Sequence, residues 1–324
     1  MKILVTGASG FLGYHIAEML VEEGHEVFNF SRNHSEELDK IQVKTRRGNL
    51  ANEREIREAL KDIEAVFHVA SKVGMWGKWE DFYQINTIGT QNLVDICQEV
   101  GIEKFVYTST PSVVFGRDSI ENGNEDIPYP KEFLSLYAKS KALAEEYVLK
   151  SNSDKFSVTA IRPHLIYGER DKNIIPRLVE AQSSGRLKSV GDRKNLVDII
   201  YVENAAKAHI DAFKELCTSK KNAGQAYFIG QEKPVNLWQF IDQLLACKGL
   251  GPVKKSISLS KAYKIGAVIE FFLKSFRIFN IHPPMTRFVA LQFGTSHYFS
   301  HEKAERDFGY SPKITIEESL KRLR

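Results

Sequence analysis

The first thirteen residues, Met1 to Gly13, constrain the fold more than any other stretch of this chain. Residues 3–5 are an apolar run that predicts a strand buried on both faces of a parallel sheet. Three glycines follow at Gly7, Gly10 and Gly13, and then apolar residues recur at helical spacing. A strand, a glycine-rich turn and a helix in this order predict a dinucleotide site, with the pyrophosphate on the amide groups at the helix N-terminus.

Composition argues against several other classes of protein. The 324 residues include 45 lysines and arginines against 41 aspartates and glutamates, scattered along the chain, so we expect no nucleic-acid partner. Cys97, Cys217 and Cys247 are widely spaced, as is typical of free thiols in a reducing compartment. The first strand begins at residue 2, and no apolar segment is long enough to span a bilayer. We therefore expect a cytoplasmic protein without a membrane span.

Strands alternate with helices through the first half of the chain, which predicts an α/β fold with a doubly wound parallel (Rossmann) sheet. The alternation of strands with helices ends beyond Pro163, where short segments alternate with loops. We expect a dinucleotide-binding domain at 1–167 with a return at about 197–216, and a smaller, discontinuous C-terminal substrate lobe at 168–196 and 217–324. The predicted strands are 3–5, 26–30, 42–44, 65–69, 104–108 and 158–161, and the longest predicted helices are 81–100 and 137–150.

Tyr137 and Lys141 are the strongest catalytic candidates. Residues four apart on a helix share a face, so the phenol and the ammonium are expected to point the same way. The pKa of free tyrosine is about 10, which is high for proton exchange at neutral pH. A neighbouring cation lowers the pKa of a phenol toward the range in which general acids work.

Hydroxyl groups gather where the predicted strand 104–108 ends, at Thr108, Ser109 and Thr110. Ligands of such folds bind at the carboxyl ends of parallel strands, so these hydroxyls are candidate donors to a carbonyl oxygen. A turn rich in serine and threonine that simply ends the strand is the alternative interpretation.

Taken together, these segments resemble the extended short-chain dehydrogenase/reductase superfamily, and within it the 3β-hydroxysteroid dehydrogenase-like group. The matching segments occur in the family's order and extend to the chain's end; they are Thr6–Gly13, His68–Ala70, Tyr83–Asn86, Tyr107–Thr110, Tyr137–Lys141, Arg162–Gly168, Tyr298–Ala304 and Phe308–Tyr310. The resemblance implies a nicotinamide cofactor and an oxidoreductase.

The resemblance also implies roles for residues of the site. Tyr137 would donate a proton, and Lys141 would hold the nicotinamide ribose and lower the pKa of Tyr137. The catalytic hydroxyl would be Thr110, although one extra residue before Phe115 leaves Ser109 as an alternative. Asn86 would steady the helix near the site and help to relay protons.

The predicted cofactor contacts come from the ends of several strands and from the glycine turn. They are Gly7, Ser9, Gly10, Phe11, Leu12, Gly13, Ser31, Arg32, Asn49, Leu50, Val69, Ala70, Ser71, Thr108, Tyr137, Lys141 and Pro163. At Asn49 the family usually has an aspartate, so this contact would use an amide. Ser31 and Arg32 end the second strand, where NAD enzymes often carry an acid. A serine and an arginine there favour NADPH over NAD, because both can donate to a 2′-phosphate.

The predicted reaction is NADPH-dependent reduction of a hydrophobic β-keto or sterol-like ketone by a homodimer that associates through the helices carrying Asn86 and Tyr137. A 3β-hydroxysteroid or sterol dehydrogenase, a nucleotide-sugar epimerase and a non-catalytic NADP-binding redox sensor remain alternatives. A sugar dehydratase is disfavoured, because that subgroup has acids after the catalytic hydroxyl where this chain has Pro111 and Ser112.

Three other patterns have two interpretations each. An apolar stripe in the C-terminal lobe is expected either to be buried there or to line a slot for an acyl chain or ring system. The aromatic residues Trp76, Trp79 and Phe82 could line a substrate mouth or belong to the core. His297 and His301 are four apart, but no third ligand is evident, so we expect no metal. The stripe consists of Ala262, Ile265, Ile269, Phe272 and Phe276.

Overall fold

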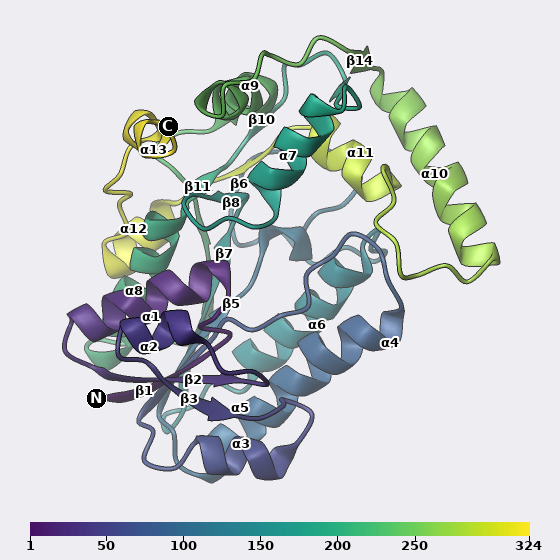
Figure 1. Cartoon of the computed structure of the whole chain (residues 1–324). Coiled ribbons are helices and arrows are strands. Elements are labelled where there is room, and N and C mark those ends of the chain that lie inside the picture. The colour runs from purple at the N-terminus through teal and green to yellow at the C-terminus, as the bar shows by residue number, and fades with distance from the viewer.

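A seven-stranded parallel sheet, in the order β12-β7-β5-β4-β1-β2-β3, forms the centre of the protein (Figure 1). The structure is a computed structural model that describes all of residues 1–324. The predicted doubly wound parallel sheet is confirmed, and the strand order reverses between β4 and β1, where such sheets bind ligands. The strands are β1 (Lys2–Thr6), β2 (Glu26–Ser31), β3 (Lys44–Arg47), β4 (Ala65–His68), β5 (Lys104–Thr108), β7 (Ser157–Pro163) and β12 (Gln225–Ile229).

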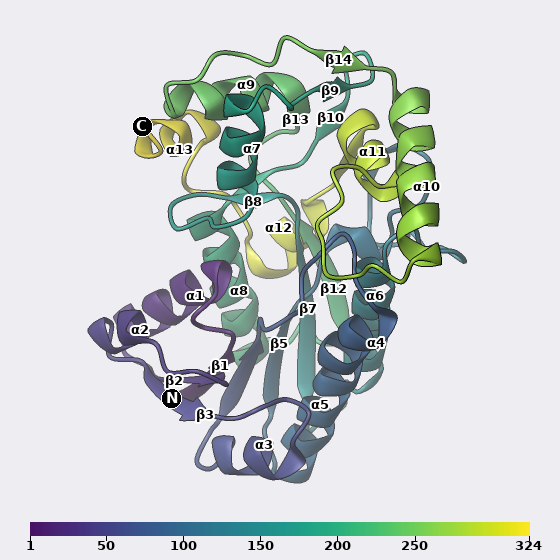
Figure 2. The same ribbon diagram turned by 45° about the vertical axis from the view of Figure 1, so that its right-hand side comes forward.

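Helices cover both faces of this sheet because residues along each strand alternate between two cores (Figure 2). In β1, Ile3 and Val5 pack in the core beneath α1 (Phe11–Glu22) and α8 (Val202–Cys217). Leu4 packs in the opposite core, beneath helices of the other layer. That layer contains α3 (Glu53–Ala59), α5 (Gly89–Glu99) and α6 (Leu136–Lys150), whereas α2 (Glu36–Lys40) follows β2.

The predicted helix at 81–100 contains a π-helical turn. It consists of α4 (Trp79–Phe82), the π-helix η1 (Tyr83–Ile88) and α5 in continuous succession. Short π-helical segments occur frequently at functional sites, since the extra residue in the turn redirects side chains. Here the π-helical turn contains Asn86.

Two elements beyond Pro163 differ from the predicted division. Residues 225–229, predicted to belong to the smaller lobe, form β12 and pair with β7 as an edge strand of the main sheet. The predicted return at 197–216 contributes helix α8 to the main domain, but its strand β11 (Ile200–Tyr201) pairs only with β8 (Ile166–Tyr167). The prediction assigned everything after residue 216 to the smaller lobe, whereas the chain returns to the main sheet as β12 after helix α8.

The smaller lobe has its own core, beyond the end of the sheet where β7 leads into β8 (Figure 2). Its helices are α7 (Ile174–Ser183), α9 (Leu237–Cys247), α10 (Leu259–Ser275), α11 (Arg287–Gly294) and α13 (Ile316–Arg322), with α12 (Glu302–Phe308) packed on the main domain. Its strands are β6 (Ile120–Gly123), β9 (Ser189–Val190), β10 (Leu196–Val197), β13 (Val235–Asn236), β14 (Ser256–Ile257) and β15 (His297–Phe299).

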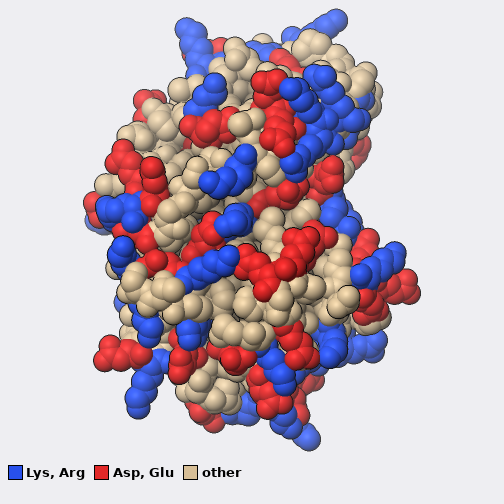
Figure 3. Space-filling view, turned by 90° about the vertical axis from the view of Figure 1, so that its left-hand side faces the viewer, with Lys and Arg blue, Asp and Glu red and all other residues tan.

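Charged side chains of both signs share the face drawn in Figure 3, where lysines and arginines lie among aspartates and glutamates. No helix of the structure is both long enough and apolar enough to cross a membrane.

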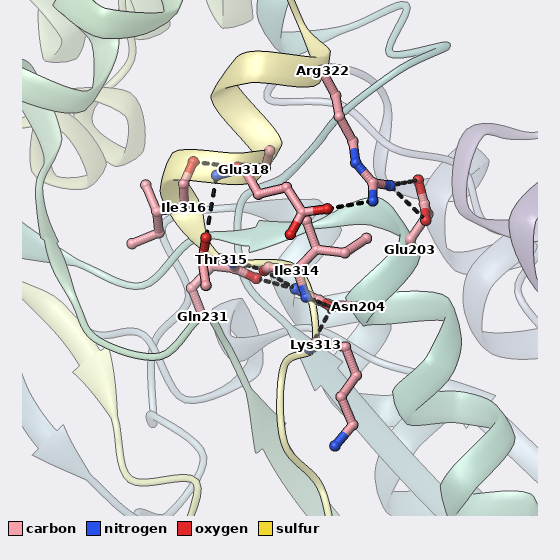
Figure 4. Close-up of polar contacts among 10 residues, drawn as sticks. Glu203, Asn204, Gln231, Lys313, Ile314, Thr315, Ile316, Glu318 and Arg322 are labelled. Atoms are coloured by element: carbon pink, nitrogen blue, oxygen red, sulfur yellow. Dashed lines mark hydrogen bonds and ion pairs between the residues drawn. The ribbon is translucent and has the colours of Figure 1, made fainter.

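Asn204, near the start of α8, joins the main domain to the C-terminal segment (Figure 4). Its side-chain oxygen accepts hydrogen bonds from the amides of Lys313 (3.0 Å) and Ile314 (3.1 Å). Its Nδ2 donates to the carbonyl oxygen of Ile314 and to the side chain of Gln231, both 2.7 Å away. All the polar atoms of this buried amide therefore have partners, which fixes the path of the chain into α13.

Candidate active site

The glycine turn between β1 and α1 leaves room for a pyrophosphate. Gly7 has a φ of +72°, and a Cβ there would lie 2.8 Å from the Cα of Ala70. A Cβ on Gly13 would lie only 2.2 Å from the carbonyl oxygen of Gly7, so α1 packs on the turn only with glycine at this position. Gly10 precedes α1 and provides no side-chain cap, which leaves the first-turn amides available to a phosphate. These features fit a dinucleotide cofactor.

The loop after β4 is attached to this turn from the other side. The amide of Ala70 donates to the hydroxyl oxygen of Thr6 (3.2 Å), and the amide of Val69 donates to the carbonyl oxygen of Thr6 (3.3 Å). The next residue, Ser71, lies beside Tyr137. The loop thus connects the proposed phosphate site to the catalytic candidates.

Tyr137 and Lys141 lie on one side of α6, as their spacing predicts. Ser135 caps the helix by accepting a hydrogen bond from the amide of Ala138 (3.3 Å), which places Tyr137 in the first turn. The Nζ of Lys141 donates to the carbonyl oxygen of Thr108, 2.6 Å away at the end of β5. The same nitrogen lies 4.1 Å from the centroid of the Tyr107 ring.

Burial, rather than the lysine, dominates the acidity of Tyr137. It raises the pKa of Tyr137 to about 12, while the hydroxyls of Thr110 and Ser71 act in the opposite direction. The prediction that Lys141 lowers this pKa is not supported by the protein alone, since the lysine is directed to Thr108. Burial also lowers the pKa of Lys141 to about 7, against the raising effect of Glu145.

The structure separates the two candidate hydroxyls. Thr110 lies beside Tyr137, and its oxygen accepts a hydrogen bond from the amide of Ser112 (3.2 Å), so its proton is available to another acceptor. Ser109 is buried beside Glu145, behind the site. Only Thr110 therefore shares the immediate surroundings of the Tyr137 hydroxyl.

Asn86 connects the π-helical turn to the loop after β4 and to α6. Its side chain accepts from the amide of Lys72 (2.7 Å) and donates to the carbonyl oxygen of Lys72 (3.0 Å). It also donates to the hydroxyl of Ser140 (2.9 Å), which in turn donates to the carbonyl oxygen of Tyr137 (2.8 Å). These contacts tie the π-helical turn to α6, and the steadying role of Asn86 stays a prediction.

A buried ion pair that the sequence analysis missed anchors α6 to the sheet. Glu145 continues the side of α6 that carries Tyr137 and Lys141, and it accepts two hydrogen bonds from Arg162 of β7, of 2.6 and 2.9 Å. Tyr129 donates to the same carboxylate (2.7 Å). The four-residue spacing 137, 141, 145 could have revealed this glutamate.

The end of β2 carries an arginine without a carboxylate partner. Ser31 donates to the carbonyl oxygen of Asn33 (2.6 Å), and Arg32 is exposed. Ser31 lies opposite Arg47 of β3 in the strand register, which places a second exposed arginine at this corner. The sequence analysis missed Arg47 because only the register brings it beside Ser31.

The other predicted cofactor contacts lie around the same crevice with differing exposure. Ser9 is exposed at the turn, Phe11 is half-buried at the start of α1, and Leu12 is buried in the core. Leu50 is half-buried, and Pro163 is buried at the end of β7. Asn49 is exposed, and its side-chain oxygen accepts from the amide of Ala51 (3.1 Å). The side-chain NH2 group of Asn49 remains free to donate.

A cavity lies next to the start of α6, between the loop after β4 and the smaller lobe. Its lining is Gly74, Met75, Trp76, Gly77, Phe82, Phe133, Leu134, Leu136, Glu270, Lys274, Phe279 and Arg287. Trp76 and Phe82 therefore line it, whereas Trp79 stacks on Tyr83. Leu136, the residue before Tyr137, lines the cavity, whereas Tyr137, Lys141 and Thr110 do not.

The interpretation of the apolar stripe as a buried side of α10 is wrong for most of it. Of its five residues only Ala262 is buried, none lines the cavity, and Ile265, Phe272 and Phe276 are exposed. The residues of α10 that line the cavity are Glu270 and Lys274.

The two histidines considered as metal ligands have different partners. The Nδ1 of buried His297 lies 2.6 Å from the Nε2 of His164, whereas the Nε2 of His301 lies 3.3 Å from the Oδ2 of Asp198. No group of three or more histidine, cysteine, aspartate or glutamate side chains is arranged to hold a metal ion.

The arrangement agrees with the comparison with known proteins. The profile of the 3-beta hydroxysteroid dehydrogenase/isomerase family matches residues 4–261, which include the glycine turn, Tyr137 and Lys141. The chain belongs to this family. The predicted resemblance to the 3β-hydroxysteroid dehydrogenase-like group is therefore confirmed.

Two relatives align along almost their whole length. The 2-alkyl-3-oxoalkanoate reductase of Stenotrophomonas maltophilia is 44% identical over 100% of this chain and 98% of its own. The sterol-4-alpha-carboxylate 3-dehydrogenase (decarboxylating) of Mus musculus is 36% identical over 99% of this chain and 89% of its own. Both names describe oxidoreductases, so the prediction of an NAD(P)-dependent oxidoreductase is confirmed.

A solved structure shares the fold. The UDP-glucuronic acid 4-epimerase of Bacillus cereus, in complex with NAD, has a TM-score of 0.76 and 21% identity, covering 100% of this chain and 98% of the epimerase. At this identity the likeness concerns the fold alone.

Proposed function

We propose that this chain uses NADPH to reduce a hydrophobic 2-alkyl-3-oxo acid to the 3-hydroxy acid. The observation that carries the proposal is the position of Tyr137, which lies beside the hydroxyl of Thr110 and one helical turn from Lys141. The relative named 2-alkyl-3-oxoalkanoate reductase supports the choice of substrate, because it is similar over the full chain. Four segments, residues 75–77, 108–113, 204–209 and 284–288, carry a narrower likeness to such reductases.

The proton chemistry follows from the surroundings of Tyr137. Because burial raises its pKa to about 12, the phenol stays protonated at neutral pH and is ready to donate. Thr110 donates its free hydroxyl proton to the carbonyl oxygen and orients it toward Tyr137. A nicotinamide cofactor held at the glycine turn would supply the hydride for the carbonyl carbon. Lys141, one helical turn from Tyr137 on the same side of α6, would hold the nicotinamide ribose.

The choice of NADPH rests on the corner formed by the ends of β2 and β3. Arg32 and Arg47 are exposed cations there, and neither has a carboxylate partner. No acid ends β2 to accept from a ribose 2′-hydroxyl or to repel a 2′-phosphate. Two arginines at this corner favour a phosphate, to which guanidinium groups bind with two hydrogen bonds.

The preference for an acid over a neutral sterol rests on the cavity beside α6. Most of its lining is apolar, as an alkyl chain requires. Arg287 is paired with buried Glu270, whereas Lys274 lines the cavity without a carboxylate partner. We assign Lys274 to the substrate carboxylate, since an ammonium group without a carboxylate partner attracts an anion.

The proposal also covers the roles of the two parts of the chain and the oligomeric state. The dinucleotide-binding part consists of residues 1–167 without β6, of residues 197–216 and of β12. The smaller lobe supplies one wall of the cavity. The chain forms a homodimer through α5 and α6, on whose side of the molecule Ile85 and Leu143 are each 37% exposed.

The test is NADPH oxidation with a 2-alkyl-3-oxo acid, a 3-ketosteroid and a UDP-sugar. The proposal predicts turnover of the oxo acid, with kcat/KM rising by up to about fourfold for each methylene buried. Turnover of the ketosteroid alone would instead favour a sterol dehydrogenase. Binding of NADPH without turnover of any ketone would favour the redox sensor.

A further inference from the structure

The cavity beside the start of α6 is smaller than the ligand proposed for it. Its volume is about 90 Å³, whereas pockets for drug-sized ligands usually have about 300–1,000 Å³. An acid that carries two alkyl chains therefore enters only if part of the wall moves. The wall consists of α4, the start of α6, the side of the smaller lobe formed by α10 and α11, and the loop of residues 73–78 after β4.

Other contacts hold two parts of this wall in place. A Cβ on Gly266 would lie 2.5 Å from the backbone carbon of Thr286, so α10 packs closely on the start of α11. Glu270 of α10 also accepts hydrogen bonds from the amide (2.6 Å) and the Nε (2.8 Å) of Arg287. The start of α6 is capped by Ser135. These walls are therefore poor candidates for the opening.

The loop of residues 73–78 is the least anchored part of the wall. No backbone amide of residues 73–77 donates a hydrogen bond, and Val73 and Met75 are 66% and 46% exposed. The residue before the loop is held, because the amide of Lys72 donates to Asn86 (2.7 Å), and α4 follows the loop. Segments with few backbone hydrogen bonds open at low free energy. The loop is therefore the part of the wall that can move.

Trp76 connects this loop to the smaller lobe. Its Nε1 donates to the carbonyl oxygen of Ile278 (2.8 Å), and its ring stacks on Phe279 with the centroids 6.1 Å apart. The amide of Ile278 donates in turn to the carbonyl oxygen of Leu273 in α10 (2.8 Å), which holds the acceptor in place. The loop and the segment between α10 and α11 lie side by side in both ribbon views (Figures 1 and 2). One hydrogen bond and one ring stack thus close this side of the cavity.

We propose that Trp76 is a gate that selects substrates by the length of their alkyl group. A short group fits the closed cavity. A longer group binds only when the indole leaves Ile278 and Phe279, so its affinity is reduced by the fraction of molecules in which the gate is closed. The loop follows Ser71, which lies beside Tyr137, so the gate opens next to the proposed proton donor. The nature of the ligand rests on the proposed function.

The first test compares kcat/KM for two 2-alkyl-3-oxo acids, one with a decyl and one with a methyl branch. Trp76→Phe keeps a ring for the stack but lacks the N–H donor. It should raise the ratio of kcat/KM, decyl over methyl, by about twofold to tenfold, which corresponds to one hydrogen bond. Phe279→Leu weakens the stack and should shift the ratio in the same direction.

Trp79→Phe is the matched control for this comparison. It makes the same substitution three residues further along, at a ring that stacks on Tyr83 and does not line the cavity. Its ratio should equal that of the parent chain. An unchanged ratio in Trp76→Phe, or an equal rise in Trp79→Phe, would overturn the proposal.

The second test follows tryptophan fluorescence and needs no turnover. Binding of the decyl 3-hydroxy acid should shift the emission to longer wavelength, because the indole of Trp76 moves into water. The shift should persist in Trp79→Phe and vanish in Trp76→Phe, while the emission of buried Trp238 reports that each variant is folded. A shift without turnover of the oxo acid would support the gate and contradict the proposed function. Turnover of the decyl acid without a shift would overturn the gate alone, and the absence of both would overturn both.

Discussion

His68 donates a hydrogen bond from its Nε2 to the hydroxyl oxygen of Thr90, 2.9 Å away. The direction follows from the partners: Thr90 uses its own proton on the carbonyl oxygen of Asn86 (2.6 Å), so its oxygen must accept. The Nδ1 of His68 therefore accepts from Thr6, 2.6 Å away, whose oxygen accepts from the amide of Ala70. One neutral imidazole thus connects the strand before the glycine turn to the π-helical turn of Asn86.

This neutral imidazole makes the protein sensitive to acid. Burial and Lys141 lower the pKa of His68 to about 3, whereas in the unfolded chain the pKa is about 6.5. Between these values the unfolded state binds a proton that the native state does not, so stability falls as the pH falls.

We expect His68→Gln to reduce the slope of the free energy of unfolding by about 1.4 kcal/mol per pH unit in this range. Urea unfolding from pH 6 to pH 4 checks this. Exposed His282→Gln is the control, and an unchanged slope for His68→Gln would refute the account.

The exposed Arg32 and Arg47 at the ends of β2 and β3 predict a change in cofactor selectivity. Charge-assisted hydrogen bonds are worth roughly 1.5–3 kcal/mol, so Arg32→Ala should weaken NADPH binding by about tenfold or more. Binding of NADH should hardly change, because it lacks the 2′-phosphate. Arg47→Ala should shift selectivity in the same direction, and exposed Arg54→Ala serves as the control. Titration of both cofactors measures this; equal weakening of NADPH and NADH would exclude Arg32 as the selector.

The cavity lysine predicts a preference for charged substrates. Lys274→Met should raise KM for a 2-alkyl-3-oxo acid by about tenfold and leave KM for the uncharged ketone of the same length unchanged. Lys264→Met is the matched control, since Lys264 lies on the same helix outside the cavity lining. Steady-state kinetics with both substrates give the comparison. A similar rise in KM for both would show that Lys274 does not contact the carboxylate.

The proposed dimer predicts a response to one charge at the interface. Burying an unpaired carboxylate is costly, so Leu143→Glu should convert the dimer to a monomer. Leu196→Glu introduces the same charge at a position of equal exposure, 37%, on β10 and should leave the dimer intact. Analytical ultracentrifugation distinguishes the species. A monomeric parent chain, or a Leu143→Glu variant that remains a dimer, would contradict the proposal.

Local spacing was enough to predict the catalytic candidates but not their electrostatics. Tyr137 and Lys141 share a helix face whatever surrounds them, and the strand end at Thr110 follows from the hydroxyl run. The pKa of Tyr137 depends on burial by other segments, and those contacts are not encoded in its neighbours. The place of Arg47 likewise depends on strand register.

The α10 helix shows why periodicity misled the prediction. An apolar stripe indicates that one side of a helix avoids water, and such a side is usually buried. The buried residues of α10 are Ala262, Gly266, Glu270 and Leu273, and two of them, Gly266 and Glu270, count as non-apolar in a sequence pattern. Their burial depends on the close approach of α11 and on Arg287, both distant in sequence. The apolar rings were therefore left outside.

Replacement of the Tyr137 hydroxyl tests the central claim most directly. If Tyr137 donates the proton, Tyr137→Phe should lower kcat by about 10²–10⁴-fold, the usual contribution of a positioned acid. The dissociation constant for NADPH should remain close to that of the parent chain. The measurement is single-turnover oxidation of bound NADPH on addition of a 2-alkyl-3-oxo acid. A nearly normal rate in Tyr137→Phe would contradict the account.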